Sequence, residues 1–211
     1  MRLIAAGRAS EVFDLGDGRI LRRFQAGGNP DREAVVMRHA ARHGYPVPAV
    51  VEVRGDALVL EHVIGPTMVA DLRRRPWRLR AHASLLARLH DRLHQIAAPE
   101  GLPAVGAGDR LLHLDLHPEN VVLSPTGPVV IDWTNARSGE PAVDVAMTWL
   151  ILETSGGLTG RLFLRPFLAH VPRDAAAAAL PVAAEWRVAD PNVSVSERDA
   201  VRRLVQRARA T

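Results

Sequence analysis

Short runs of alternating hydrophobic and polar residues fill most of the first 63 positions of the chain. The runs LIAAG, EVFDL and RILRRF are separated by Gly7 and by the Gly-Asp-Gly segment at positions 16–18. Such runs, bounded by glycine-rich turns, are typical of antiparallel strands joined by hairpins. A second pair, AVVEV and ALVLEHV, flanks Arg54-Gly55-Asp56 and predicts another hairpin. The pattern therefore predicts five strands.

One helix interrupts these strands. The segment NPDREAVVMRHAARHG, residues 29–44, begins with Asn29, which is a good N-cap, and Pro30, which suits the first helical turn. Gly44 suits the residue that ends the helix. We expect three strands, one helix and two further strands in this order.

From Gly65 onward the hydrophobic spacing becomes helical. Residues 77–98 predict a long helix whose apolar stripe faces a core, made of Leu85, Leu86, Leu89 and Leu93. A further helix is expected from about Pro141, followed by a helical tail interrupted at TSGGLTG. Ser196 and Asp199, three positions apart, resemble a capping box for the last helix.

Composition narrows the function classes. The 211 residues include no cysteine, which excludes a disulfide framework, a thiolate metal site and a cysteine nucleophile. All 27 basic residues are arginine and the net charge is only +4, so the pI of 10.9 does not indicate a nucleic-acid partner. No signal peptide or apolar run of about 20 residues is present, so we expect no membrane partner and a cytoplasmic location.

The stretch LLHLDLHPENVVLSPTGPVVIDW, residues 111–133, concentrates the candidate chemistry. If it were a strand, His113, Asp115 and His117 would share one face, as zinc ligands would. Pro118 and the five-residue interval from Asp115 to Asn120 fit a loop that enters a hairpin better. In the loop interpretation one carboxylate and one amide precede a second carboxylate at the end of the stretch.

These residue types match the needs of phosphoryl transfer from a nucleotide. That reaction needs a carboxylate that orients the attacking hydroxyl, metal ions on the phosphates and cations on the phosphate oxygens. Asp115 is the candidate for the first task. Asn120 and Asp132 supply oxygen ligands, which suit Mg²⁺.

The motifs HLDLHPEN, VVIDW and GEPAVDVA resemble those of the aminoglycoside phosphotransferase family, small-molecule kinases with a protein-kinase-like fold. The resemblance is strong over residues 111–149 and weaker over the N-terminal part. It implies a bilobal α+β fold. Residues 1–63 would form a small N-lobe, with a five-stranded antiparallel sheet, one helix and the hinge, and residues 64–211 a larger, mainly helical C-lobe.

The resemblance also implies roles for residues of the C-lobe. Asp115 matches the catalytic carboxylate, and Asn120 and Asp132 match the two metal ligands. Asp144 matches a buried carboxylate that holds backbone N–H groups of the catalytic loop, and His113 would support the same loop.

In the N-lobe, the segment GRASEVFDL matches the turn that covers the nucleotide phosphates, with Ser10 as a donor. Glu33 matches the helix carboxylate that pairs with a strand cation, here Arg22. The base of ATP or GTP would contact the hinge backbone at Glu61 and Val63. The implied cofactors are therefore ATP or GTP and Mg²⁺.

The chain departs from the family pattern in three places. The first is the strand cation, where the family commonly has lysine or arginine and this chain, which has no lysine, offers Arg22. Thr134 and Asn135 stand where many members have a carboxylate or glycine, and their roles, like that of His117, are left open. The segments that build the acceptor pocket are shorter than in antibiotic-modifying members. This favours an open site, a small substrate, or a homodimer in which a second subunit completes the pocket.

We therefore predict an ATP-dependent or GTP-dependent O-phosphotransferase acting on a hydroxyl of a small molecule. Residues 153–211 hold nine arginines and six acidic residues, which disfavours polycationic acceptors. A catalytically weak or inactive nucleotide-binding regulatory protein is the alternative. A zinc hydrolase based on His90, Asp91 and His94 lacks a third ligand in the sequence.

Overall fold

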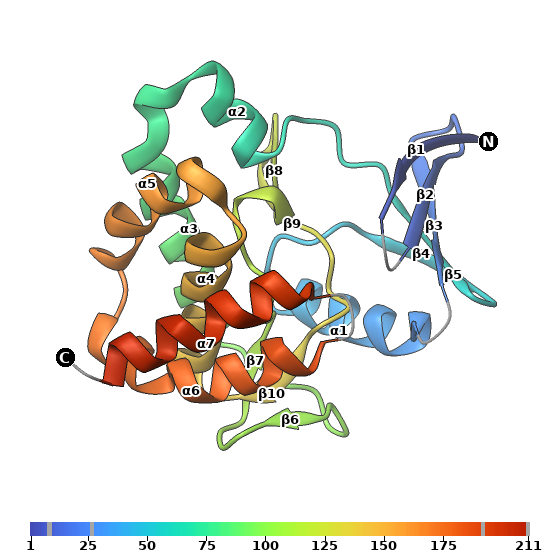
Figure 1. The fold of residues 1–211 in the computed structure, drawn as a ribbon. Helices are drawn as coiled ribbons and strands as arrows, with labels where there is room; N and C mark the ends of the chain where they lie inside the picture. Colours follow the sequence, from blue (N-terminus) through green and yellow to red (C-terminus); the bar gives the residue numbers. More distant parts are fainter. Residues whose placement is uncertain (8–9, 26–27, 191–192, 210–211) are drawn as a thin grey trace.

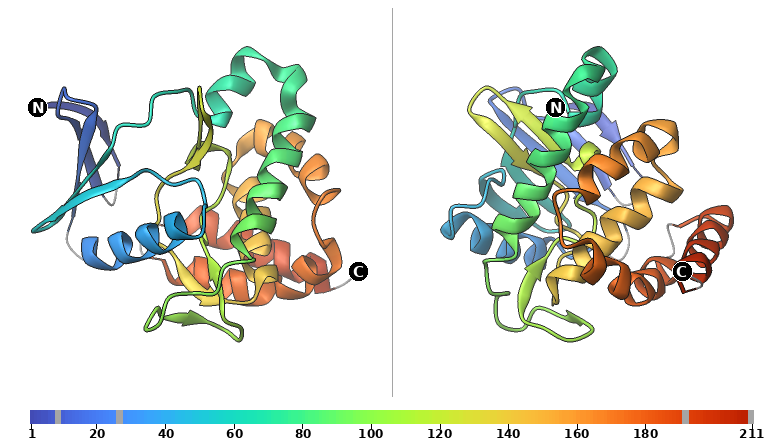
Figure 2. Two further views of the ribbon diagram at one scale, coloured as in Figure 1. Left: turned by 180° about the vertical axis from the view of Figure 1, so that it is seen from behind. Right: turned by 90° about the vertical axis from the view of Figure 1, so that its left-hand side faces the viewer.

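The computed structural model describes residues 1–7, 10–25, 28–190 and 193–209. A small sheet with one helix lies at one end of the molecule, and a larger group of helices lies at the other (Figures 1 and 2). The sheet has five antiparallel strands in the order β1-β2-β3-β5-β4. This architecture confirms the predicted fold class. The division near residue 63 stays a prediction.

The elements of the first part follow the predicted order. They are β1 (Arg2–Ala6), β2 (Ser10–Asp14), β3 (Arg19–Phe24), α1 (Pro30–Arg42), β4 (Val50–Arg54) and β5 (Ala57–Glu61). The side chain of Asn29 caps α1 by accepting a hydrogen bond from the Arg32 backbone N–H at 2.8 Å. Gly44 follows the helix with φ +72°, a conformation that glycine adopts without strain. The expected turn residues Arg8 and Ala9 lie outside the described residues.

The second part contains six α-helices and two small β-sheets among the described residues. Its helices are α2 (Met68–Arg74), α3 (Leu79–Leu93), α4 (Pro141–Thr154), α5 (Gly157–Leu168), α6 (Arg173–Ala189) and α7 (Val195–Arg209). Its strands are β6 (Ala104–Val105), β7 (Arg110–Leu112), β8 (Val121–Ser124), β9 (Gly127–Val130) and β10 (Arg137–Gly139), and short 3₁₀ turns span Pro76–Arg78 and Pro118–Asn120.

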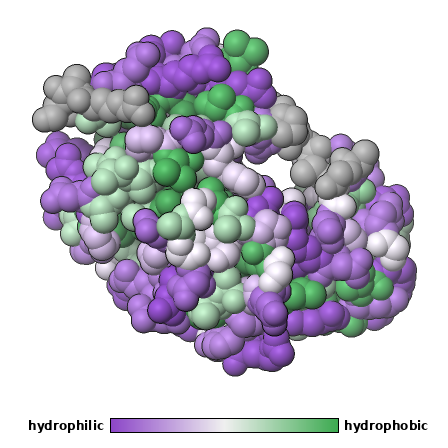
Figure 3. Space-filling model, turned by 90° about the horizontal axis from the view of Figure 1, so that it is seen from below, coloured by the Kyte–Doolittle hydropathy of each residue, from purple (hydrophilic) through white to green (hydrophobic). Residues whose placement is uncertain are grey.

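The central helix α4 is buried on nearly all sides because α3, α5 and α6 pack around it. The predicted stripe of α3 faces this core: Leu86, Leu89 and Leu93 are buried and Leu85 is half-buried. The outer side of α6 carries small apolar side chains, seen from below as a pale green area (Figure 3). No helix of the described residues is long and apolar enough to span a bilayer.

The predicted cap of the last helix was wrong by two residues. Helix α7 starts at Val195, and the Oγ of Ser194 accepts a hydrogen bond from the Glu197 backbone N–H at 3.2 Å. Ser194 and Glu197 therefore have the spacing of a true capping box, whereas Ser196 lies inside the first turn. The Ser194 hydroxyl reaches a backbone N–H of the first turn, whereas the Glu197 carboxylate accepts hydrogen bonds from Arg187 and Ser155 instead.

A buried polar cluster connects α3, α4 and the segment after β7. The Asp144 carboxylate accepts hydrogen bonds from the backbone N–H groups of His113 at 3.2 Å and Leu114 at 2.7 Å, and from His94 Nε2 at 3.0 Å. His90 Nδ1 lies 3.5 Å from the same carboxylate. Burial alone would raise the pKa of Asp144, but the two imidazoles outweigh it and hold the pKa well below its ordinary value.

The structure supplies the third polar group that the zinc interpretation of α3 lacked. Ligand atoms of His90, His94 and Asp144 all lie within 4.8 Å of one another. None of the three side chains is more than 8% exposed, however. A hydrolytic zinc ion needs an open coordination position for water and substrate. The burial therefore argues against a zinc hydrolase and for a structural cluster beneath the loop that carries Asp115.

The core packing around α3 predicts a large stability difference between two leucines. Leu86 is fully buried on α3, whereas Leu158 on α5 is 75% exposed. Leu86→Ala should lower the free energy of unfolding by about 2–5 kcal/mol, because it leaves a cavity. Leu158→Ala, the matched control, should change it by less than about 0.5 kcal/mol. Urea denaturation of both variants checks this, and equal effects would contradict the described core.

The buried imidazoles predict a pH dependence of stability. Burial lowers the pKa of His90 and of His113, so both rings stay neutral in the folded chain. Below about pH 6.5 the unfolded chain takes up protons that the folded chain does not, so stability falls as the pH is lowered from 7 to 5. Each ring contributes up to about 1.4 kcal/mol per pH unit. The depressed pKa of Asp144 adds nothing here, because its contribution is lost only at lower pH.

Denaturation at several pH values tests this dependence in three proteins. The substitution His90→Gln should flatten the slope of the unfolding free energy against pH, since one of the two buried rings is gone. The substitution His170→Gln, at an exposed position, should leave the slope as it is in the unaltered chain. An unchanged slope in His90→Gln would show that this ring is protonated in the folded state as well.

Candidate active site

The segment after β7 forms a loop rather than a continuing strand. The strand ends at Leu112, and Leu114 has φ +58°, a left-handed conformation that is rare for a leucine. The alternation that would align His113, Asp115 and His117 is therefore broken. The two backbone hydrogen bonds to Asp144 hold the chain in this turn, which directs Asp115 into a cavity.

The imidazole ring of His113 supports the same loop through two contacts with the backbone. Its Nε2 lies 3.1 Å from the Ile131 carbonyl oxygen, and its Nδ1 lies 3.2 Å from the Asp115 backbone N–H. A neutral ring satisfies both contacts by donating from Nε2 and accepting at Nδ1. Burial lowers the pKa of His113, which favours this neutral form. The ring thus connects the turn before Asp115 to the segment that precedes Asp132.

Asn120 lies next to Asp115 on the 3₁₀ turn that leads into β8. Its Nδ2 donates to the Asp115 backbone oxygen at 2.8 Å and to Asp115 Oδ2 at 3.0 Å. These bonds fix the amide so that its oxygen, Oδ1, faces away from Asp115. Among the described residues no hydrogen bond reaches this oxygen, which leaves it available as a ligand.

Asp132 follows β9 in a second left-handed turn, with φ +64°. Its Oδ1 accepts hydrogen bonds from Arg22 Nη2 at 2.7 Å and from the Thr134 hydroxyl at 3.0 Å. Within the described part of the chain, no hydrogen bond reaches its Oδ2. Arg22 lowers the pKa of Asp132 against the opposing effect of burial, so the carboxylate stays ionised.

Arg22 joins three separate elements. Its guanidinium, only 8% exposed, contacts Glu33 Oε1 of α1 at 2.5 Å and the Asp132 carboxylate at 2.7 Å. Its Nε also donates to Ser10 Oγ of β2 at 3.0 Å. One guanidinium here faces two carboxylates, and a second one, from Arg32, reaches the Thr134 carbonyl oxygen at 3.5 Å. Burial, together with the charge of Asp132, raises the pKa of Glu33 despite Arg22.

The hinge residues lie apart from this cluster. Glu61 is exposed at the end of β5; its backbone N–H donates to the Ala49 oxygen at 2.9 Å, and its carboxylate accepts from the Ala49 N–H at 3.2 Å. Val63 is half-buried in the segment after β5. The structure does not place either residue in the cavity, and their role toward the nucleotide base stays a prediction.

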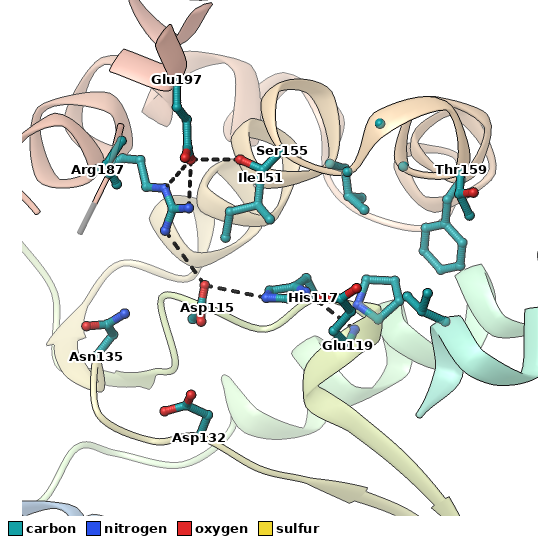
Figure 4. Close-up of a pocket in the computed structure, with 18 of the residues that line it drawn as sticks. Asp115, His117, Glu119, Asp132, Asn135, Ile151, Ser155, Thr159, Arg187 and Glu197 are labelled. Atoms are coloured by element: carbon teal, nitrogen blue, oxygen red, sulfur yellow. Dashed lines mark hydrogen bonds and ion pairs between the residues drawn. The ribbon is translucent and has the colours of Figure 1, made fainter. Parts of the chain in front are cut away.

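A cavity of about 570 Å³ opens beside Asp115 and Asp132 (Figure 4). Its other walls come from α2, from the ends of α4 and α6, and from α5 and α7. His117, for which the sequence predicted no role, lies at this cavity. Its Nε2 is 3.6 Å from Asp115 Oδ1 and 3.3 Å from Asn120 Nδ2. The cavity therefore lies on the side of Asp115 where the helical part would hold an acceptor.

Several residues of the site were not predicted from the sequence. Thr134 contacts Arg22, Glu33 and Asp132 through its hydroxyl, which gives this family departure a place in the charged cluster. Arg187 and Glu197 reach the cavity from α6 and α7. The sequence marked Thr134, two residues after Asp132, only as a departure from the family pattern and gave it no role. No sequence signal indicates Arg187 and Glu197, because both lie far along the chain from the motifs.

Comparison with known structures supports the fold. The aminoglycoside phosphotransferase APH(4)-Ia superposes with a TM-score of 0.70 at 16% identity, covering 99% of this chain and 91% of that chain. A choline/ethanolamine kinase family protein from Mesorhizobium loti gives 0.64 at 18% identity, covering 100% and 86%. At these identities the likeness shows the fold alone. A search of curated proteins found no match.

The comparison with family models supports a stronger conclusion than the comparison with solved structures. The model of the phosphotransferase enzyme family APH matches residues 64–190, which include the loop with Asp115 and Asn120 as well as the turn with Asp132. The matched region covers more than half of the sequence and contains the walls of the cavity formed by α2, α4 and α5. The chain therefore belongs to the phosphotransferase enzyme family.

Proposed function

We propose that this protein transfers the γ-phosphate of ATP or GTP to a hydroxyl group of a small molecule. The observation that carries the proposal is that Asp115 and Asp132 line one cavity, with Asn120 hydrogen-bonded to Asp115 and Arg22 hydrogen-bonded to Asp132. Family membership supports the reaction class. Structures of similar fold were obtained with ADP and hygromycin B, and with GDP, which supports nucleotide use here.

The residues at this edge fit a magnesium ion. The carboxylate Oδ2 of Asp132 and the amide Oδ1 of Asn120 are hard oxygen donors that the described residues leave without hydrogen bonds. We propose that Asn120 and Asp132 hold Mg²⁺, which would neutralise charge on the nucleotide phosphates.

Side chains of the protein would have the remaining roles in the reaction. Asp115 would accept a hydrogen bond from the acceptor hydroxyl and take up its proton, while its other oxygen stays bonded to Asn120. The hydroxyl oxygen forms a bond to the γ-phosphorus, and the bond from that phosphorus to the β–γ bridging oxygen breaks, which releases ADP or GDP. Arg22 would stabilise negative charge on the phosphates, with Glu33 and Ser10 fixing its side chain.

A turnover experiment tests this function. The protein with Mg²⁺ and ATP or GTP is screened against hydroxyl compounds, and nucleoside diphosphate release and phosphorylated product are both measured. The substitution Asp115→Asn should lower kcat about 100-fold to 10,000-fold, because the amide cannot take up the hydroxyl proton. Nucleotide binding, measured by calorimetry, should stay within a factor of a few.

The substitution Asp109→Asn is the matched control, because this aspartate is 84% exposed and lies outside the cavity. It should leave kcat unchanged. Nucleotide binding without transfer to any acceptor would instead favour the regulatory alternative. Turnover that is equal in Asp115→Asn and in the unaltered protein would contradict the role given to Asp115.

A further inference from the structure

Arg187 is held rigidly at the edge of the cavity, although the proposed reaction gives it no task. Its Nε and Nη2 both donate to Glu197 Oε1, at 3.0 and 2.7 Å, and the Ser155 hydroxyl donates to the same oxygen at 2.7 Å. The side chains of Arg187 and Glu197 are each only 16% exposed. Three helices, α4, α6 and α7, thus fix one guanidinium in place.

The remaining nitrogen of this guanidinium faces Asp115. Nη1 lies 3.8 Å from Asp115 Oδ1, beyond hydrogen-bond distance, and makes no hydrogen bond within the described part of the chain. Figure 4 shows Arg187 and Asp132 on opposite sides of Asp115. Because Asp132 marks the proposed nucleotide side, Nη1 lies on the acceptor side.

Arg187 Nη1 and Asp115 Oδ1 have complementary hydrogen-bonding capacity. Nη1 can only donate and the ionised carboxylate oxygen can only accept. A reacting hydroxyl that donates to Asp115 Oδ1 places its neighbouring substituent close to Nη1. An oxygen there accepts a charge-assisted hydrogen bond, whereas an ammonium group would meet a second cation and a second donor.

We propose that Arg187 binds an oxygen next to the reacting hydroxyl, so that the acceptor is a 1,2-diol or a 2-hydroxy acid rather than a 2-amino alcohol. This inference rests on the proposed function. It concerns only the atom beside the reacting hydroxyl, because Glu119 and Asp190 also line the cavity and can face other parts of the acceptor. Glu197 is the positioning residue, since it orients the guanidinium without reaching Asp115 in the described contacts.

Three matched probes test the inference: glycerol, glycerate and 2-amino-1,3-propanediol, which differ in the group beside a hydroxyl. With Mg²⁺ and ATP, the unaltered protein should have a higher kcat/KM for glycerol and glycerate than for the amino alcohol. Arg187→Gln should lower kcat/KM for the two oxygen compounds by about 10-fold to 100-fold, mainly through KM, because a charge-assisted hydrogen bond is lost. Its kcat/KM for the amino alcohol should not fall.

Two further variants separate binding from folding. Glu197→Gln keeps Arg187 but weakens its anchor, and should give a smaller loss of the same kind. Arg202→Gln breaks an exposed ion pair to Asp199 on α7 and should change nothing. Calorimetric ADP binding equal to that of the unaltered protein shows that each variant is folded. A higher kcat/KM of the unaltered protein for the amino alcohol than for glycerol and glycerate overturns the inference. It is also overturned if Arg187→Gln leaves the ratio of these kcat/KM values unchanged.

A binding measurement distinguishes this inference from the proposed function. In the ¹⁵N-arginine NMR spectrum with Mg²⁺ and ADP, the Arg187 side-chain signal is assigned by its absence in Arg187→Gln. Glycerate should shift this signal, and 2-amino-1,3-propanediol should not. A shift without any phosphate transfer would contradict the function but support the contact. Transfer to glycerate without a shift would support the function and overturn the role of Arg187.

Discussion

The buried guanidinium of Arg22 is the interaction on which the arrangement of the site depends. It connects strand β3 to helix α1 through Glu33, and the sheet to the helical part through Asp132. Removing one partner from a buried ion pair costs about 3–5 kcal/mol, because the other charge is left uncompensated. Arg22 engages only Oδ1 of Asp132, which leaves Oδ2 at the point where the proposed magnesium would bind.

The loop with Asp115 is fixed from the opposite side by Asp144. The backbone N–H groups of His113 and Leu114 point at this fully buried carboxylate, so a left-handed turn at a leucine is tolerated. Leu114 and Asp132 are the non-glycine residues with positive φ in the described chain, and they lie beside the two proposed reactive positions. Strained backbone at a site persists only where surrounding contacts enforce it, as they do here.

The fold and half of the site could be predicted from the sequence because their signals are local. Alternation, the cap at Asn29 and turn glycines each act within a few residues, and Asp115, Asn120 and Asp132 lie within one stretch. Arg187 and Glu197 could not be found in this way, because their meeting depends on how α6 and α7 pack. The misplaced cap of α7 had a different cause: two serines lie within three residues, and the hydroxyl of the earlier one reaches the backbone N–H of Glu197.

In the proposed mechanism, Asp132 and Asn120 bind a divalent cation beside the nucleotide. Mn²⁺ in place of Mg²⁺ allows this to be measured by electron paramagnetic resonance in the presence of ADP. Mn²⁺ should bind to the unaltered protein with ADP, and Asp132→Asn should weaken this binding at least about tenfold, since a carboxylate ligand is lost. Equal Mn²⁺ affinity in the two proteins, both folded, would contradict the proposed mechanism.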